Sequence, residues 1–409
     1  MDAKASLKRV VKSIVPISVI DGLKKQLLLS YMRKCLCDKA ALGEYPFGIN
    51  LIGPIRGDYG LGESCRLIAD IVRASGVPFT VINTSFGNPA ETDRTWIEYE
   101  REDFPYSINL IHINPAILAQ VAATQKKKEM FQRYNIAYWL WELPEFPEEW
   151  DYTFEFFDEI WTPAEFISES IRAHTDKPVR TVPYAFRTPQ TEQGCDRQYF
   201  GLPEDKFLFM VSYDGNSVSE RKNPKGTLNA FRKAFSSSED GVGLVIKATH
   251  ASDAEIASLR ELLPGYSNVF ILRENYPKKV FNSLISCVDC YVSLHRAEGF
   301  GLVMAEAMLL GTPTIATNWS ANTEFMNDTV ACMVPAQIIE LEHDLYPYHK
   351  GNHWADPDED VAAQQMRKLY DDRQLCNQLA KRALAHMEAA FSLETAAGRL
   401  LNYLPHEAK

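Results

Sequence analysis

Two glutamates stand eight positions apart in the segment HRAEGFGLVMAEAM, which covers residues 295–308. Glu298 precedes a Gly-Phe-Gly turn, and Glu306 lies in the run of helix-forming residues after the turn. Glycines allow the backbone to approach a ligand closely, and the start of a helix presents free N–H groups that attract phosphate. A carboxylate on either side of that phosphate can accept hydrogen bonds from sugar hydroxyls. The spacing therefore predicts a site for a phosphate flanked by two sugars, as in a nucleotide sugar.

A second candidate for phosphate binding follows a predicted strand at 207–212. The loop after this strand ends in Arg221 and Lys222, and Pro224 is well placed as the first residue of a helix. Arginine offers a planar fork of donors and lysine a point charge, so the two together can neutralise a diphosphate. The alternative interpretation is a solvated basic turn.

These residues need a scaffold, and the chain from residue 48 onward alternates apolar strand patterns with helical ones. Parallel sheets with helical crossovers produce this alternation, so we predict an α/β architecture of two Rossmann-like domains facing each other across a cleft. Ligands of such sheets bind beyond the carboxyl ends of the strands. The predicted strands are 48–53, 79–83, 107–113, 135–141, 158–163, 179–184, 207–212, 242–248, 268–273, 289–294 and 312–317, and the predicted helices are 63–75, 224–236, 253–263, 278–286, 302–310 and 359–370.

The chain has 409 residues, which exceeds the roughly 250–300 residues that one hydrophobic core supports. Shifts in composition divide it into five segments. They are a basic amphipathic N-terminal segment (1–45), an N-terminal Rossmann-like domain (46–186), a polar linker (187–206), a C-terminal Rossmann-like domain (207–385) and a C-terminal helix that could pack back on the N-terminal domain (386–409).

Charge is distributed unevenly along the chain. Residues 1–40 hold nine of the 43 basic residues and three of the 54 acidic ones, which leaves 34 and 51 for the rest. A basic amphipathic leader favours contact with an anionic membrane surface, although a solvated helix or a tail has the same composition. The net charge of -11 argues against a nucleic-acid binder. Without an apolar run of about 18 residues or a signal peptide, we expect a cytoplasmic protein that can lie peripherally at the inner face of the cytoplasmic membrane.

The segment EGFGLVMAEAMLLGTPTIAT, residues 298–317, resembles the donor site of glycosyltransferase family 4, and Glu298 to Glu306 matches the E-x7-E element of retaining GT-B glycosyltransferases. The resemblance is specific over 206–330, weaker over 48–186 and absent from 1–45. It implies a retaining, metal-independent transferase of the hexosyl type (EC 2.4), with 46–186 as the acceptor domain and 207–385 as the donor domain. By similarity, Glu298 faces the transferred sugar and Glu306 binds the ribose diol. Backbone amides of Gly299, Phe300 and Gly301, and the helix starting at Leu302, receive the donor.

The same resemblance gives roles to other residues. Lys222 matches a phosphate-binding lysine of the family, whereas Arg221 is a looser inference because Ser212-Tyr213 replaces the usual Gly-Arg. Gly60 and Gly62, in GPIRGDYGLGES (53–64), resemble the family's glycine loop under the donor phosphates. Their spacing is not that of the G-x-G-x-x-G fingerprint, which disfavours an oxidoreductase. A tight strand-to-helix turn is the alternative.

Catalytic residues of the N-terminal half match less well. Many family 4 members carry a histidine after the strand that corresponds to 135–141, where this chain has Trp141-Glu142. Glu142 could approach the sugar or the acceptor hydroxyl, and His112 is the second candidate. Either residue could equally be structural.

We expect no metal and no cofactor, because the resemblance implies that Arg, Lys and helix amides stabilise the leaving diphosphate. Asp356 to Asp360 looks like an acidic metal motif but precedes a predicted helix, where capping explains it. Cys287 and Cys290 are interpreted as buried thiols. The predicted reaction transfers a sugar from a UDP- or GDP-sugar to a glycan or lipid-linked glycan acceptor. The alternatives are an inactive nucleotide-sugar-binding scaffold and a GT-B nucleotide-sugar epimerase.

Overall fold

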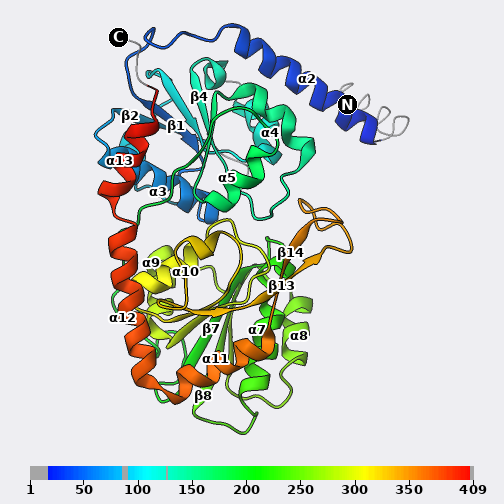
Figure 1. Cartoon of the computed structure of the whole chain (residues 1–409), viewed down its shortest axis with the longest axis vertical. Helices are drawn as coiled ribbons and strands as arrows, with labels where there is room; N and C mark the ends of the chain where they lie inside the picture. The colour runs from blue at the N-terminus through cyan, green and yellow to red at the C-terminus, as the bar shows by residue number, and fades with distance from the viewer. Residues whose placement is uncertain (1–16, 85–90, 126–127, 406–409) are drawn as a thin grey trace, which may run out of the picture.

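The computed structural model describes residues 17–84, 91–125 and 128–405, and it contains two parallel six-stranded sheets stacked along the long axis of the molecule (Figure 1). The N-terminal sheet has the order β2-β1-β3-β4-β5-β6. Its inner strands are almost completely buried, as is typical of a parallel sheet with helices on both faces. The strands are β1 (Ile49–Gly53), β2 (Phe79–Asn83), β3 (Ile108–Ile111), β4 (Tyr134–Tyr138), β5 (Glu159–Thr162) and β6 (Val179–Thr181).

The helices of this domain include α3 (Gly60–Ala74), α4 (Pro115–Gln125) and α5 (Glu165–Arg172). Helix α3 follows β1 and has a strongly one-sided apolar face that includes Ile68 and Val72. Helix α2 (Ile17–Cys37) packs against α4, and its residues Met32 and Cys35 are buried. The 3-10 segments of the domain are η1 (Ile97–Tyr99), η2 (Lys128–Phe131) and η3 (Glu148–Phe156).

The C-terminal sheet repeats the scheme with the order β12-β11-β10-β7-β8-β9. Its strands are β7 (Phe207–Asp214), β8 (Val242–Thr249), β9 (Val269–Leu272), β10 (Cys290–Ser293), β11 (Thr314–Thr317) and β12 (Cys332–Val334). Its helices are α6 (Ser219–Lys222), α7 (Pro224–Ala234), α8 (Asp253–Glu261), α9 (Lys278–Cys287), α10 (Leu302–Leu309) and α11 (Glu359–Asp371), with η4 (Ala321–Glu324) after β11. The predicted α/β class and the two Rossmann-like domains are confirmed.

An antiparallel hairpin interrupts the C-terminal domain between β12 and α11. It consists of β13 (Ala336–Glu340) and β14 (His353–Pro357), and the sequence pattern did not predict it. In Figure 1 the hairpin projects from the side of the C-terminal domain toward the N-terminal domain. It is therefore an addition to the doubly wound sheet rather than a part of it.

The last two helices connect the domains a second time. Helix α12 (Arg373–Ala390) runs along the C-terminal domain, and α13 (Leu393–Tyr403) lies against α3 of the N-terminal domain (Figure 1). Arg180 stacks over the Tyr403 ring at 5.0 Å, and Phe186 N donates to Phe391 O at 3.0 Å. Residue 385, the predicted end of the donor domain, lies inside α12.

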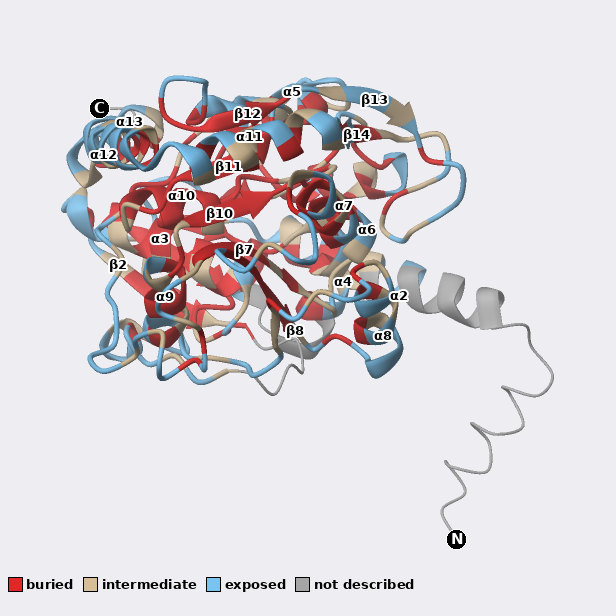
Figure 2. Ribbon diagram, turned by 90° about the horizontal axis from the view of Figure 1, so that it is seen from below, coloured by how far each residue is buried: buried red, intermediate tan, exposed pale blue. Residues whose placement is uncertain are grey.

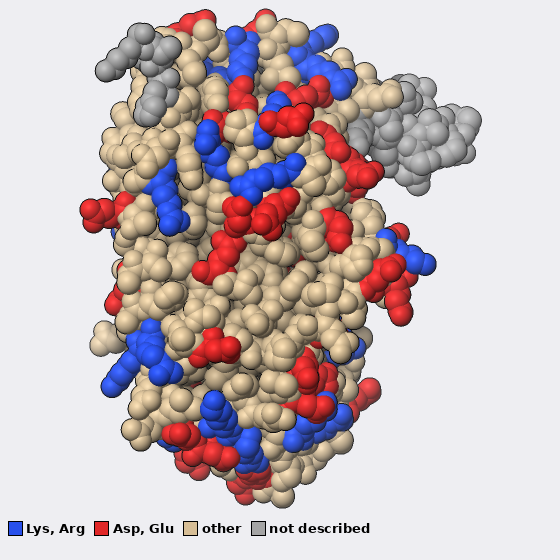
Figure 3. Space-filling view, in the orientation of Figure 1, with Lys and Arg blue, Asp and Glu red and all other residues tan. Residues whose placement is uncertain are grey.

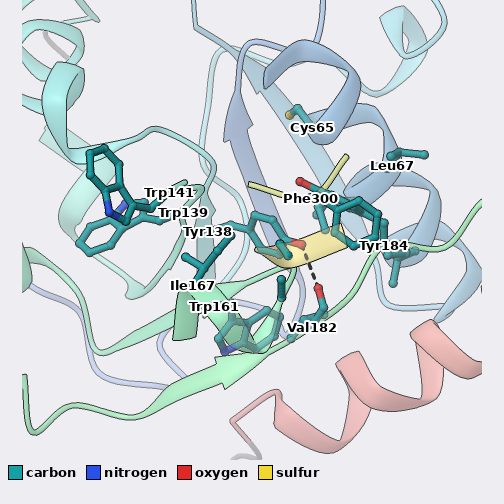
Figure 4. Close-up of a cluster of buried hydrophobic side chains, with 14 of the residues drawn as sticks. Cys65, Leu67, Tyr138, Trp139, Trp141, Trp161, Ile167, Val182, Tyr184 and Phe300 are labelled. Carbon is teal, nitrogen blue, oxygen red and sulfur yellow. Dashed lines mark hydrogen bonds between the residues drawn. The ribbon is translucent and has the colours of Figure 1, made fainter. Parts of the chain in front are cut away.

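The hydrophobic core is continuous across the two domains. Both sheets are buried while the outer helix faces are exposed (Figure 2). One cluster of buried side chains joins the N-terminal domain to the facing side of the C-terminal sheet, and a second covers the other side of that sheet. Phe300 packs edge-on against Tyr184 of the N-terminal domain at 4.8 Å, and the close-up in Figure 4 shows the two rings together. The site predicted from the sequence therefore lies where the domains meet.

Candidate functional site

The Gly-Phe-Gly turn before α10 has a backbone that requires its glycines. Gly301 precedes the helix with a φ of 100°, in the left-handed region that favours glycine. A Cβ atom on Gly299 would lie 3.2 Å from Trp141 O, so this position allows close approach of the N-terminal domain. Gly311 follows the helix with a φ of 73°, as a C-terminal cap. The turn thus brings the start of α10 against the segment that follows β4.

Glu298 forms an ion pair with Lys222, and its Oε2 lies 3.7 Å from Arg221 Nη1. Burial alone would raise the pKa of Glu298, but Lys222 and Arg221 outweigh burial and lower it to about 2. Burial lowers the pKa of Lys222, and Glu298 opposes that change. The loop that the sequence predicted to end at these cations contains the short helix α6, with Arg221 and Lys222 in its last turn. The structure therefore brings together two cations from α6 and one carboxylate from the turn before α10, and the carboxylate is ionised at neutral pH.

Local hydrogen bonds fix Arg221. Its Nη1 donates to Ala297 O at 3.0 Å, its Nη2 donates to Ser217 Oγ at 3.1 Å, and only 7% of the residue is exposed. The next turn is fixed by Asn223, which has a φ of 49° and accepts from Gly226 N at 3.1 Å, so it caps α7. The predicted start of that helix at Pro224 is confirmed.

Glu306 lies on α10 and is 3% exposed. One of its oxygens forms an ion pair with Lys278, the first residue of α9. The other, Oε2, is buried without a hydrogen-bond partner among the described residues. Burial raises the pKa of Glu306, and Lys278 opposes that rise. Burying a carboxylate oxygen without a hydrogen bond costs free energy. The oxygen therefore marks a position where a ligand hydroxyl can donate a hydrogen bond.

The glycine loop after β1 faces this carboxylate from the N-terminal domain. A Cβ atom on Gly62 would lie 2.0 Å from Gly57 O, so only glycine fits there, whereas Gly60 starts α3 and faces open space. Burial would raise the pKa of Glu63, the next residue, but Lys278 and Arg66 outweigh burial and lower it. Charges from α3 and α9 thus meet beside Glu306.

The structure separates the two candidates of the N-terminal half. A Cβ on Gly299 would lie 3.6 Å from Glu142 Cγ, and the Glu142 carboxylate interacts electrostatically with Arg221 and Lys222. His112 is fully buried, and its Nε2 is hydrogen-bonded to Ser64 Oγ at 2.5 Å inside the N-terminal domain. Burial lowers the pKa of His112 to about 3, so it stays neutral. Glu142 therefore lies at the domain junction, while the geometry assigns His112 to the interior of its own domain.

Three residues of the site were missed by the sequence analysis. His295 is buried beside Glu298, with Nε2 3.1 Å from Asn322 Oδ1, and burial lowers its pKa. Its place as the first residue after a strand could have revealed it. Lys278 and Tyr348 reach the site from distant segments, and no local pattern around them indicates this.

The acidic segment before α11 has structural partners. Asp358 caps the helix by accepting from the N–H groups of Asp360 and Val361 at 2.9 and 3.0 Å. Asp356 pairs with Arg296 Nη2 at 2.8 Å. The described part of the chain contains no group of three or more histidine, cysteine or carboxylate side chains that could hold a metal ion.

Residues 196–386 match the model of the family described as glycosyl transferases group 1. The match covers a little under half of the chain and corresponds to the C-terminal domain. A putative glycosyltransferase of Bacillus subtilis (strain 168), YtcC, is 25% identical over 209 residues, which are 50% of this chain and 46% of the relative. The match thus spans about half the length of that relative.

Solved structures show the same fold over most of the chain. Anabaena Alr3699/HepE in complex with UDP and glucose gives a TM-score of 0.63 at 13% identity and covers 87% of this chain and 98% of that one. A glycosyltransferase from Rickettsia africae ESF-5 gives 0.62 at 11% identity and covers 87% and 97%. The group 1 segment is therefore the C-terminal half of a GT-B fold, as the sequence predicted.

Proposed function

We propose that the protein is a retaining glycosyltransferase that moves a hexosyl-type sugar from a UDP- or GDP-sugar to an acceptor hydroxyl. One observation carries the proposal: Glu298, Lys222 and Arg221 lie together at the start of α10, and Glu306 on the same helix has an unpaired buried oxygen. A carboxylate, a group of cations with helix amides, and a second carboxylate would in that order suit the sugar, the diphosphate and the ribose of a nucleotide sugar. The similar Anabaena protein was solved in complex with UDP and glucose, which agrees with this class of donor.

Each residue then has a role in binding. Arg221 and Lys222, with the first amides of α10, would neutralise the diphosphate. Glu298 would accept hydrogen bonds from the sugar hydroxyls, and Glu306 Oε2 would accept them from the ribose. The open face of Gly60, at the start of α3, leaves room on the opposite side of the donor.

The chemistry that we propose is a front-face transfer. The bond between the anomeric carbon and the diphosphate oxygen breaks, and the sugar passes through an oxocarbenium-like state that the Glu298 carboxylate stabilises. The acceptor hydroxyl then forms the new bond on the same face, and its proton goes to the departing diphosphate oxygen. Glu142, at the domain junction, would orient the acceptor hydroxyl. Lys222 and Arg221 balance the negative charge of the leaving diphosphate, which a divalent metal would otherwise balance.

For the acceptor we propose a glycan of a surface polysaccharide or a lipid-linked glycan. The support is the basic composition of residues 1–40, which suits an anionic membrane surface at the cytoplasmic side. Among the described residues, no helix is both long and apolar enough to cross a bilayer. Basic and acidic side chains are interspersed on the face shown in Figure 3, and the net charge of -11 does not suit nucleic acid.

Release of nucleoside diphosphate tests the proposal. The protein is incubated with a panel of UDP- and GDP-sugars, first with water and then with methanol as the acceptor, and the anomeric configuration of the product is read by NMR. Because a free sugar mutarotates, the configuration is read on the methyl glycoside that forms with methanol as the acceptor. We expect slow turnover of one donor with retention, and its loss in Glu298→Gln. Binding without turnover would indicate a scaffold, and a new sugar isomer on the intact donor would indicate an epimerase. Binding of no nucleotide would overturn the proposal.

A further inference from the structure

The β13–β14 hairpin is held against the N-terminal domain by paired histidines and glutamates. His353 Nδ1 lies 2.8 Å from Glu145 Oε1, and its backbone N–H donates to the other oxygen of Glu145 at 3.2 Å. His349 Nε2 lies 2.8 Å from Glu149 Oε1. Both glutamates lie in the segment after β4, only a few residues beyond Glu142. The hairpin is therefore docked beside the candidate site and not only on the domain that carries it (Figure 1).

The base of the hairpin is joined to the donor-site loops. Ala355 N donates to Arg296 O at 2.9 Å, and Arg296 Nη2 donates to Asp356 at 2.8 Å. Arg296 N in turn donates to Arg221 O at 2.7 Å. Strand β14 is thus two hydrogen bonds away from the arginine that we place on the diphosphate. A displacement of the hairpin would therefore also change the position of Arg221.

Tyr348 connects these two attachments. The residue is 3% exposed, and its ring centroid lies 5.5 Å from that of Trp141, which Figure 4 shows beside Trp139. Its hydroxyl interacts electrostatically with the side chains of Glu142 and Arg221. Burial, followed by the charge of Glu142, raises the pKa of Tyr348 well above its ordinary value. The hydroxyl therefore keeps its proton, which it can donate to a carboxylate.

This arrangement differs from a simple packing contact. Glu142 belongs to the N-terminal domain and Arg221 to the C-terminal domain, so one hydroxyl on a third segment interacts with charged groups of both domains. Arg221 is held by hydrogen bonds to Ala297 and Ser217 that do not involve Tyr348. The position of Glu142 consequently depends more on Tyr348 than the position of Arg221 does.

We propose that Tyr348 is a positioning residue that orients Glu142 toward the acceptor hydroxyl when the hairpin is docked on the N-terminal domain. The proposal rests on the proposed function, in which Glu142 orients the acceptor. It assigns the hairpin to the acceptor side of the reaction. Because donor contacts belong to α10, Arg221 and Lys222, loss of the tyrosine hydroxyl should affect transfer more than donor binding.

Tyr348→Phe tests this with one atom removed and the ring retained. The assay is hydrolysis of whichever UDP- or GDP-sugar of the panel the wild type turns over, in which water takes the acceptor position. We expect kcat to fall about 10-fold or more, as for loss of a hydrogen bond to a charged group, with donor KM within about threefold of wild type. Tyr346→Phe makes the same change on a side chain that is 71% exposed and should leave both constants unchanged.

Two measurements separate positioning from folding. The affinity for UDP or GDP, measured by calorimetry, should be the same in Tyr348→Phe and wild type, which also shows that the variant is folded. His353→Gln loosens the hairpin at a point away from the site. As a single substitution it should lower kcat, but in combination with Tyr348→Phe it should lower kcat little further.

Wild-type kcat in Tyr348→Phe, or a fall in kcat fully matched by a rise in donor KM, would overturn the positioning role and leave the glycosyltransferase proposal intact. If Tyr348→Phe lost nucleotide binding together with thermal stability, Tyr348 would be structural and the inference would be wrong. Failure of the wild type to bind UDP or GDP and to turn over any donor would overturn both proposals.

Discussion

Replacing Glu306 by alanine tests the assignment of the donor site most directly. In the structure this carboxylate is 3% exposed, pairs with Lys278 through one oxygen and leaves the other unpaired within the described residues. If that oxygen accepts hydrogen bonds from the ribose, it does so in the ground state and in the transition state alike. The substitution should therefore raise donor KM with little change in kcat.

The size of the effect follows from the charge and burial of the group. Losing hydrogen bonds to a charged, buried acceptor costs about 1.5–3 kcal/mol, which corresponds to a factor of roughly 10–150 in KM or in the Kd of the nucleoside diphosphate. The free protein should lose little stability, because burial already opposes ionisation of Glu306 and the Lys278 side chain, 41% exposed, can be solvated without its partner. Glu306→Gln keeps an acceptor oxygen and should recover part of the affinity.

The assay is calorimetric titration with UDP and GDP, together with donor KM and kcat from nucleotide release. Glu159→Ala is the matched control: Glu159 is a 4% exposed glutamate that pairs with Arg180 in the N-terminal sheet, away from the proposed donor site. It should lower the melting temperature and leave KM unchanged. If Glu306→Ala kept KM and Kd within twofold of wild type, or resembled Glu159→Ala, the ribose contact would be wrong.

Other perturbations test other parts of the proposal. Lys222→Ala should weaken UDP or GDP binding more than binding of the corresponding nucleoside, because its partner is phosphate; equal losses in calorimetry would make Lys222 structural. Chelator should leave nucleotide release unchanged, and a loss that magnesium or manganese restores would show that the acidic segment at Asp356 was misinterpreted. Deleting residues 1–16, which spares the buried Met32 and Cys35 of α2, should weaken cosedimentation with anionic vesicles; unchanged cosedimentation would argue against a membrane role for these residues.

The sequence determined the features that depend on near neighbours. A left-handed φ at Gly301, the Asn223 and Pro224 cap of α7, the Asp358 cap of α11 and the apolar strands of both sheets are all specified within a few residues. Local backbone sterics and hydrogen bonds decide such features, so the order of the predicted strands and helices agrees with the structure. The short strand β12, helices α4, α5, α6 and α12, and the hairpin were missed.

Only the tertiary structure decided which charged groups meet. Lys222 and Glu298 are 76 positions apart, and Glu145 and His353 are 208 positions apart. Such pairs depend on how one domain docks on the other, and nothing in the neighbouring residues specifies it. The same docking places Glu142 at the domain junction while His112 remains in the interior of its own domain, although in the sequence both lie at the end of a predicted strand or directly after it. The glycines and carboxylates in and just before α10 can be recognised in the sequence, but the groups that surround them depend on the packing of the two domains.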